Sequence, residues 1–483
     1  MSAHLNRIAR IPIWLWLVIL GAAGLAMALI YPDSFQQDGG FHFLYARSAW
    51  KHPSMFVEVW PRPLFTFLYS FPAQLGYLPA KLLTVVIALI TAYQTYLLAQ
   101  QLRMEHPTWV APLLFLQPAY LMLSADTMTE PLFALLLVIA LRLHQLKREF
   151  AGMAVASLLI LARPEGFFIG VLWGLWILLD RSSARTLWRR LASTAILASG
   201  AFLWWFGALL FSGNPFFIRD NWPPEWGVTS SADRAGTFWD YAHRLPNIAG
   251  PLLCALLILG LISALFRRQL GTVASVFLAF FLLHSAFRSL GLFGSAGYAR
   301  YFVCVAPAIA LLTLAGWNQL AVWARNVPKP IQVATAGIIF FISGVAAVSY
   351  TDFTAYTRDS RAIAEMVSWF HRNGRPFSKM IYSQAYMAIL MDQDVGERVR
   401  AGSNRATNLE IFRNMPIGTL VFWDRETGPA WYGIKAEDLV SEGYTLLQSQ
   451  SYVMQGWMPP RLRWWYYDWG PRKQQMHLLY KDR

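Results

Sequence analysis

The sequence predicts a mainly α-helical, polytopic membrane protein that carries a small α/β domain at its C-terminal end. Only 14% of its 483 residues are charged and 56% are hydrophobic, whereas a soluble globular protein carries about a quarter charged residues. Apolar runs such as residues 12–31 and 331–350 reach the roughly 20 residues that cross a bilayer. Twenty-two tryptophans and twenty tyrosines fit the aromatic belts at the two membrane surfaces.

About eleven transmembrane segments are predicted from these apolar runs, and the fifth and sixth are short. They lie near residues 12–31, 80–102, 108–124, 130–147, 151–163, 167–180, 191–211, 247–266, 270–287, 301–318 and 331–350. The first run also has two features of a signal peptide, a basic start and the triplet Ala26-Met27-Ala28. Its apolar core is nearer to about 20 residues than to the roughly 7–15 of a cleaved signal, so we expect a retained span.

Charge predicts the orientation, because cytoplasmic loops of membrane proteins carry an excess of Lys and Arg. With the N-terminus in the cytoplasm and the sides alternating, the basic residues collect on the cytoplasmic side. They are Arg7, Arg10, Arg103, Arg142, Lys147, Arg148, Arg181, Arg185, Arg189, Arg190, Arg267, Arg268, Arg325 and Lys329. This pattern accounts for much of the net charge of +14 and makes a nucleic-acid partner unnecessary. Short connections favour a bacterial inner membrane.

The chain divides into a membrane domain, residues 1–350, and a soluble domain, residues 351–483. The membrane domain has long loops at 32–79 and 212–246, and an odd number of spans places these loops and the C-terminal domain outside the cytoplasm. In that domain a helix and three strands are expected from their patterns of apolar residues. The segments are "AIAEMVSWFHRNG", "GTLVFWD", "YTLLQSQSYVM" and "QMHLLYK". Acids and long loops therefore gather on the outer side, where we expect the function to lie.

The first candidate site is "QDGGFHFLYARSAW", just after the first span. In a helix, Asp38, His42 and Tyr45 would share one face because they are spaced i, i+4 and i+7. A carboxylate there can accept the proton of a hydroxyl nucleophile. Asp38 could alternatively act only as the helix cap. Asp33 is a rival acid, although "YPDS" has the composition of a turn.

The second candidate is "LSADTMTEPLF", where Asp126 and Glu130 are spaced i, i+4 at the outer end of a hairpin. Carboxylates at membrane depth tend to line cavities. The alternative is a capping box, in which Thr127 and Glu130 satisfy the backbone at a helix start.

The third candidate is "ARPEG", which breaks the chain between two short helices and leaves Arg163 near the outer leaflet. A guanidinium can hold a phosphate with two parallel hydrogen bonds. A salt bridge to an outer acid is the alternative for Arg163.

The fourth candidate is "SAFRSLGLFGSAGYARYFVCVAP", in which Arg288, Arg300 and Tyr301 flank an irregular, glycine-rich stretch. Irregular backbone at membrane depth must be buried in protein or face water, and two arginines at its borders suggest an anion site. The alternative is that these arginines extend to the membrane surface. The two cysteines, Cys254 and Cys304, form no metal-ligand cluster with histidines, and nucleotide-binding motifs are absent.

Residues 1–350 resemble the GT-C superfamily of polyprenyl-phosphate-sugar glycosyltransferases, which includes mannosyl- and arabinosyltransferases. The resemblance depends on Asp38 with a following "YAR", and on "SADTMTEPLF", "LARPEG" and "YARYFVCVAPAIALL". It implies transfer of a hexose or pentose from a polyprenyl-phosphate donor to a glycan, lipid or protein acceptor, with inversion. Asp38 matches the acid of the family's first loop, the proposed base. Many relatives have two acids there, whereas Asp38 is followed by Gly39 and Gly40, and no metal or other cofactor is indicated.

The expected substrate-binding residues are His42, Tyr45, Asp126, Glu130, Arg163, Arg288, Arg300 and Tyr301. Of these, the three arginines suit the donor phosphate, because the departing phosphate gains negative charge that guanidinium groups stabilise. A transporter or flippase of a lipid-linked substrate is the alternative function. Transporters place their sites near the bilayer midplane and often have repeated halves, whereas no repeat is visible here. A structural membrane subunit is a third interpretation.

Overall fold

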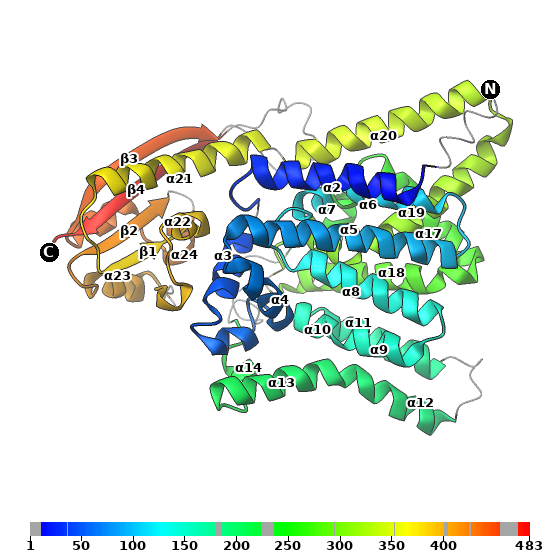
Figure 1. Cartoon of the computed structure of the whole chain (residues 1–483), viewed down its shortest axis with the longest axis horizontal. Coiled ribbons are helices and arrows are strands. Elements are labelled where there is room, and N and C mark those ends of the chain that lie inside the picture. Colours follow the sequence, from blue (N-terminus) through cyan, green and yellow to red (C-terminus); the bar gives the residue numbers. More distant parts are fainter. Residues whose placement is uncertain are drawn as a thin grey trace.

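The computed structural model describes residues 11–35, 37–179, 186–223, 236–293, 295–351, 353–399, 404–424, 427–454 and 472–483. Figure 1 shows a bundle of roughly parallel helices with a small sheet domain at one end of it. The label for the N-terminus lies at the opposite end of the molecule from the sheet. The protein is therefore mostly helical, with several apolar helices and a small C-terminal sheet.

The bundle and the loops at its end contain the helices of the first 351 residues. They are α2 (Ile13–Ile30), α3 (Gln37–Ser48), η1 (Pro53–Val57), α4 (Pro63–Ala73), α5 (Tyr77–Gln101), η2 (Pro107–Trp109), α6 (Val110–Phe115), α7 (Pro118–Leu123), α8 (Glu130–Gln145), α9 (Glu149–Ser157), α10 (Leu159–Ala162), α11 (Gly166–Leu179), α12 (Leu187–Thr194), η3 (Ala195–Ala198), α13 (Ser199–Ser212), α14 (Phe217–Asp220), α15 (Asp240–His243), α16 (Leu245–Ala249), α17 (Leu253–Phe266), η7 (Arg268–Leu270), α18 (Gly271–Leu290), η8 (Ala299–Val305), α19 (Ala306–Trp323), η9 (Ala324–Asn326) and α20 (Lys329–Thr351).

Helices occupy all eleven segments that the sequence predicts to be transmembrane, but several of those helices are broken. Pro118 separates α6 from α7, because a proline has no backbone N–H to continue the helix before it. Among the described residues, six helices are long and apolar enough to cross a membrane, and α11 and α17 are shorter apolar helices. The count of eleven crossings therefore stays a prediction.

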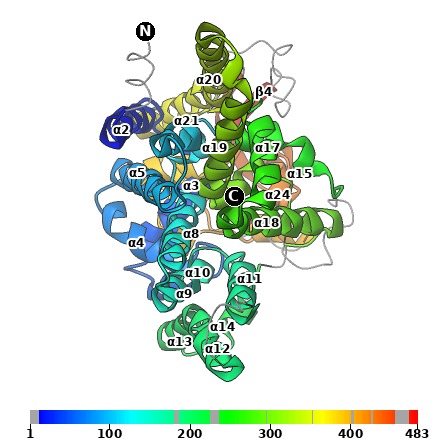
Figure 2. The ribbon, with the colours of Figure 1, turned by 90° about the vertical axis from the view of Figure 1, so that its right-hand side faces the viewer.

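The centre of the bundle is α19, which is buried over most of its length. Figure 2 views the bundle along its helices and shows α19 between α5 and α17. Glycines let α17 and α19 approach closely: a Cβ on Gly260 would lie 1.8 Å from the carbonyl oxygen of Leu312, and one on Gly316 would lie 1.9 Å from that of Leu256. Small residues commonly allow such close packing between membrane helices.

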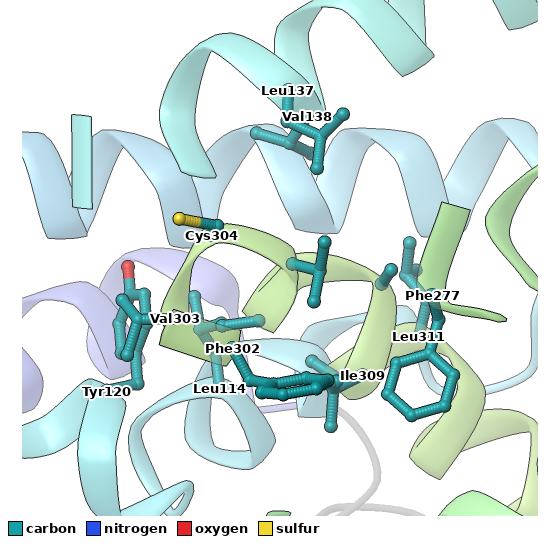
Figure 3. Packing of buried hydrophobic residues seen from close by; sticks show 14 of the residues in the cluster. Leu114, Tyr120, Leu137, Val138, Phe277, Phe302, Val303, Cys304, Ile309 and Leu311 are labelled. Atoms are coloured by element: carbon teal, nitrogen blue, oxygen red, sulfur yellow. The ribbon is translucent and has the colours of Figure 1, made fainter. Parts of the chain in front are cut away.

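The hydrophobic core of the bundle extends from α19 to the neighbouring helices. Figure 3 shows Phe302, Ile309 and Leu311 packed with Phe277 and Leu137, which come from α18 and α8. By contrast, α12 and α13 lie at the edge of the bundle in both views.

The C-terminal domain, which we call the outer domain after the side predicted for it, has one four-stranded mixed sheet with the strand order β1-β2-β4-β3. Its elements are α21 (Phe353–Asn373), β1 (Lys379–Tyr382), α22 (Ala385–Leu390), η10 (Val395–Glu397), α23 (Arg405–Arg413), β2 (Thr419–Asp424), α24 (Thr427–Tyr432), α25 (Ala436–Ser441), β3 (Tyr444–Met454) and β4 (Arg472–Lys481). β1 pairs with β2 in parallel, and β4 is antiparallel to β2 and β3. The helix and three strands expected from the sequence are present.

The loop predicted at residues 32–79 folds into α3, η1 and α4 at the end of the bundle that faces the sheet domain (Figure 1). α3 packs against α22 of the outer domain. The loops that contain Arg103, Lys147, Arg267 and Arg325 follow the other ends of α5, α8, α17 and α19, away from the sheet. The acidic loops and the basic loops thus lie at opposite ends of the bundle, as the charge pattern predicts. Arg7, Arg10, Arg181 and Arg185 lie outside the described residues.

Candidate active site

The site begins with Asp38 in the first turn of α3. The helix starts at Gln37, so Asp38 is a residue of the first turn and not the cap that the sequence analysis weighed. Its carboxylate Oδ2 lies 2.5 Å from Nη2 of Arg300, which comes from η8. The Asp38 side chain is 39% exposed, whereas that of Arg300 is 11% exposed. The carboxylate thus lies at the mouth of a site whose guanidinium lies deeper.

Close packing around α3 explains the two glycines that follow Asp38. A Cβ on Gly39 would lie 2.4 Å from Oγ of Ser34 and 2.6 Å from Oδ1 of Asp126. A Cβ on Gly40 would lie 2.7 Å from Cβ of Ala385 in the outer domain. These distances leave no space for a second acidic side chain at either position, so a carboxylate pair cannot form here without a rearrangement.

Asp38 lines a cavity of about 130 Å³. The cavity lies at the junction of α3, the loop before α4 and the starts of α8, α11 and η8. Six of the nine residues proposed from the sequence line it. They are Asp38, His42, Glu130, Arg163, Arg300 and Tyr301. Residues far apart in the sequence therefore meet in one polar cavity at the end of the bundle near the outer domain.

The segment "ARPEG" supplies the cavity with an ion-paired cluster. Arg163 forms an ion pair with Glu130, with 2.7 Å between Nη1 and Oε1, and its Nη2 lies 2.7 Å from Oε1 of Glu165. All three side chains are nearly buried. Gly166 is needed for this tight turn, because a Cβ there would lie 2.3 Å from the backbone nitrogen of Ile160. The salt bridge that the sequence offered as an alternative for Arg163 is therefore present.

Three further residues that were not predicted from the sequence also line the cavity: Arg62, Glu165 and His284. Arg62 precedes Pro63 in the motif "WPRP" and has a φ of 70°, which is uncommon for a residue with a side chain. Its Nη1 donates to the carbonyl oxygens of Val59 and Trp60, at 2.5 and 2.7 Å. An arginine between two prolines in an outer loop was a signal that could have identified this position.

The charges of these groups influence one another. Burial would raise the pKa of Asp38, but the charge and hydrogen bond of Arg300, together with the electrostatic influence of His42 and Arg62, outweigh burial and hold the pKa below its usual value. Burial lowers the pKa of His42 to about 3 despite the neighbouring Asp38, so this imidazole is neutral at physiological pH. Burial opposes ionisation of Glu165, but the charge and hydrogen bonds of Arg163 lower its pKa to about 2. The cavity thus combines ionised carboxylates with a neutral histidine.

Three of the residues proposed from the sequence lie outside the cavity lining: Tyr45, Asp126 and Arg288. Tyr45 is buried beside Trp60, with 5.9 Å between the ring centroids. Arg288 pairs with Asp240, with 2.7 Å between Nε and Oδ2, and donates to the carbonyl oxygen of Ser295. Arg288 thus reaches the cavity wall through Ser295.

Asp126 belongs to a hydrogen-bond network that holds the start of α3 in place. Its Oδ1 accepts hydrogen bonds from Oγ of Ser34 at 2.7 Å and from the backbone of Thr127 at 2.8 Å. The side chain of Thr127 in turn donates to the carbonyl oxygen of Gly39 at 2.7 Å. The capping box expected as an alternative for this segment does not form, because α8 begins at Glu130 and its cap, Thr129, makes no side-chain hydrogen bond to the helix backbone.

The rival acid, Asp33, lies outside the cavity lining and faces the outer domain. Its Oδ2 accepts a hydrogen bond from Oγ of Ser360 in α21 at 3.3 Å. Burial raises its pKa to about 8, so this group is mostly protonated at neutral pH. Among the described residues, no group of three or more His, Cys, Asp or Glu side chains is arranged to hold a metal ion.

The arrangement of the fold matches solved structures, although no protein-family model and no curated protein sequence matches the chain. ArnT from Cupriavidus metallidurans bound to undecaprenyl phosphate superimposes with a TM-score of 0.62 at 13% identity, over 96% of this chain and 97% of that one. Its apo form gives 0.61 at 14% identity, over 99% and 98%. An Archaeoglobus fulgidus oligosaccharyltransferase tethered to an acceptor peptide gives 0.50 at 13% identity, over 90% and 72%. These likenesses show that the chain shares the fold of ArnT and of the oligosaccharyltransferase.

Proposed function

We propose, from its GT-C fold and the residues of its cavity, that the chain is a membrane glycosyltransferase. It would move a sugar from a polyprenyl-phosphate carrier to an acceptor hydroxyl at the extracytoplasmic face. The single observation that carries this proposal is the pairing of Asp38 with Arg300 inside a cavity that also contains Arg62 and Arg163. A base and several phosphate-binding groups then lie within one site. The acceptor would be a glycan, a lipid or a protein.

In this proposal Asp38 acts as the general base. The acceptor oxygen forms a bond to the anomeric carbon, and its proton passes to the carboxylate of Asp38. The bond from the anomeric carbon to the phosphate oxygen breaks, and its electrons stay on the phosphate. The acceptor attacks from the face opposite the leaving group in a single displacement, so the anomeric carbon of the product has inverted configuration. One carboxylate is enough for this mechanism. The partial exposure of Asp38 gives an acceptor access to it.

Arg300 and Arg62 are the groups we assign to the donor phosphate. Arg163 is already engaged by two carboxylates, Glu130 and Glu165, and is better suited to hold those acids in place. Guanidinium groups in a site shielded from water stabilise the charge that builds on the departing phosphate. A phosphate that binds Arg300 would also compete with Asp38 for it. Donor binding would thereby release the carboxylate and raise its basicity.

The isoprene tail of the donor needs an apolar path from the lipid to the cavity. An apolar cleft of about 580 Å³ between α4 and α13 is lined by Leu64 and Leu161. Leu64 is two residues from Arg62 and Leu161 is two residues from Arg163, so the cleft and the polar cavity are lined by neighbouring residues of the same two segments. We assign the carrier tail to this cleft.

The position of the cavity favours transfer over transport. Transporters place their substrate sites near the bilayer midplane, whereas this cavity lies where the bundle meets the outer domain. The orientation predicted from the basic loops puts that end outside the cytoplasm. The host membrane would then be the bacterial inner membrane, with a cytoplasmic N-terminus and the sheet domain outside.

The test replaces Asp38 with asparagine in the full chain reconstituted in liposomes. Asp38→Asn should lower transfer from a polyprenyl-phosphate hexose by about 100-fold or more, the range of general base catalysis. Asp33→Asn is the matched control, because Asp33 is mostly protonated at neutral pH and lies outside the cavity. Normal turnover by Asp38→Asn, with Asp33→Asn also active, would remove Asp38 from the role of base.

A further inference from the structure

The cavity holds two buried histidines that the phosphate chemistry does not use. His284 lies in α18 with 3% of its surface exposed, and His42 lies in α3 with 5% exposed. Within the described part of the chain, neither ring nitrogen of His284 has a hydrogen-bond partner, and the same holds for Nδ1 of His42. The nearest carboxylate to His284 is that of Glu165, 3.8 Å from Nε2, which is beyond hydrogen-bond distance. Buried polar atoms without a partner are rare, and each calls for an explanation.

Both imidazoles are held rigidly by aromatic side chains. His284 stacks on Tyr301, with 5.3 Å between ring centroids and 24° between planes. His42 stacks on Trp60, with 4.5 Å and 19°. A polar group that is fixed in place but lacks a partner can bind a ligand without paying the entropy of becoming ordered.

We infer that His284 and His42 donate and accept hydrogen bonds to the hydroxyl groups of the transferred sugar, and that this sugar is neutral. This inference rests on the proposed function, and it adds the chemical class of the substrate. A neutral imidazole offers one donor and one acceptor nitrogen, which suits a hydroxyl group that does both. The aromatic side chains of Trp60, Phe168 and Phe287 also line the cavity and can pack against the C–H faces of a sugar ring.

The charges of the cavity explain why a charged sugar is disfavoured. Among the described residues that line it, the arginines are Arg62, Arg163 and Arg300, and the carboxylates are Asp38, Glu130 and Glu165, so three positive charges face three negative ones. Glu130 and Glu165 share Arg163, and Asp38 pairs with Arg300. An ammonium group on the sugar would meet Glu130 and Glu165, which Arg163 already pairs. A carboxylate on the sugar would add a second negative charge beside that of the phosphate.

The charges around His42 also disfavour a cationic sugar. After burial and the opposing effect of Asp38, the charges of Arg62, Arg163 and Arg300 lower the pKa of this imidazole further. A cationic sugar placed beside His42 would be repelled by the same three guanidinium groups. The imidazole itself stays uncharged and available for hydroxyl groups.

The experiment measures binding of short-chain donors to the full-length protein in lipid nanodiscs. The probes are farnesol, farnesyl phosphate, and farnesyl phosphate carrying mannose, glucose, galactose, 4-amino-4-deoxyarabinose or glucuronic acid. At least one neutral sugar should increase the affinity about tenfold over farnesyl phosphate, which is about 1.4 kcal/mol, because buried polar groups of the cavity gain hydrogen-bond partners. The two charged sugars should give no such gain. Tightest binding of either charged sugar would overturn the inference.

A variant then tests His284 itself. His284→Phe should remove the roughly tenfold gain from the neutral sugar and leave the affinity for farnesyl phosphate unchanged, whereas His284→Gln should restore part of the gain. His144→Phe is the matched control, because His144 packs against Trp173 and Trp176 at the other end of α8. A neutral-sugar gain that persists in His284→Phe would also overturn the inference. Farnesyl phosphate binding no tighter than farnesol would instead count against the proposed function.

Discussion

Nη2 of Arg300 lies 2.5 Å from Oδ2 of Asp38, although 262 positions separate the two residues in the sequence. This pair joins α3, at the start of the chain, to η8, which leads into the central helix α19. Arg300 therefore influences both the position and the basicity of the carboxylate that we assign as the base. In the ligand-free site the charge of Arg300 is neutralised by that of Asp38, and in the proposed mechanism a bound phosphate would replace Asp38 as the partner of Arg300.

The pH dependence of transfer should report this pair. In the free enzyme burial opposes ionisation of Asp38, but neighbouring groups, Arg300 foremost, hold its pKa below the usual value, so kcat/KM should stay high well into the acidic range. In Arg300→Gln the charge of Arg300 is lost and burial remains, so the pKa of Asp38 should rise. The acid limb of the kcat/KM profile, which reports the free enzyme, should then move to higher pH.

Arg300→Lys is the control for this prediction, because it keeps the positive charge but loses the planar fork. Its acid limb should stay close to that of the wild type, while its KM for the donor rises. An identical acid limb in Arg300→Gln and in the wild type would show that Asp38 is not the titrating base.

The close packing of α3 on the outer domain makes Gly40 sensitive to substitution. A Cβ at Gly40 would lie 2.7 Å from Cβ of Ala385, and neither atom can rotate away. Gly40→Ala should lower the free energy of unfolding by about 1–3 kcal/mol, the cost of overpacking. Thermal unfolding of the detergent-solubilised protein measures this change.

Gly170→Ala provides the matched control, since nothing lies within 4 Å of a Cβ at Gly170 in α11. In a helix, alanine is more favourable than glycine by roughly 0.5–1 kcal/mol, so this variant should be as stable as the wild type or more stable. A lower unfolding temperature for Gly170→Ala than for Gly40→Ala would contradict the packing that the structure shows at α3.

The ion pair between Arg163 and Glu165 should contribute stability that depends on pH. The pKa of Glu165 is lowered from 4.5 to about 2, so its contribution is fully present above about pH 4.5 and is lost as the pH falls toward 2. A shift of this size corresponds to about 3 kcal/mol. At pH 7, Glu165→Gln should therefore unfold at a clearly lower temperature than the wild type, and the difference should shrink below about pH 4.5. A difference that stays constant down to pH 3 would show that the lost stability does not come from the charge.

Much of the fold could be predicted from the sequence because membrane helices leave a strong local signal. A run of apolar residues sets both the length and the position of a span, and the predicted segments coincide with helices. The break between α6 and α7 depends on Pro118, a local feature. β1, with only four residues from Lys379 to Tyr382, was missed because so short a run carries little periodicity.

The site was predictable only where a polar residue stands out against an apolar background. Asp38, Glu130, Arg163 and Arg300 were found in this way, and all four line the cavity. His284 was missed because one histidine in an apolar helix is more often a packed core residue. The roles of Asp126 and Arg288 could not be separated from those of the cavity residues, because their partners, Ser34 and Asp240, are set by tertiary contacts that no local pattern records.

The orientation of the chain can be tested with reporter fusions. The charge of the loops predicts that the outer domain lies outside the cytoplasm, and α20 runs from the end of the bundle where α2 begins toward that domain (Figure 1). Alkaline phosphatase, whose disulfides form only in an oxidising compartment, should be active when fused after Arg483. The same reporter fused after Arg148, in the basic loop between α8 and α9, should be inactive. Activity after Arg148 and none after Arg483 would show the reverse orientation. The cavity with Asp38 and the arginines would then face the cytoplasm, and the donor would have to bind from that side.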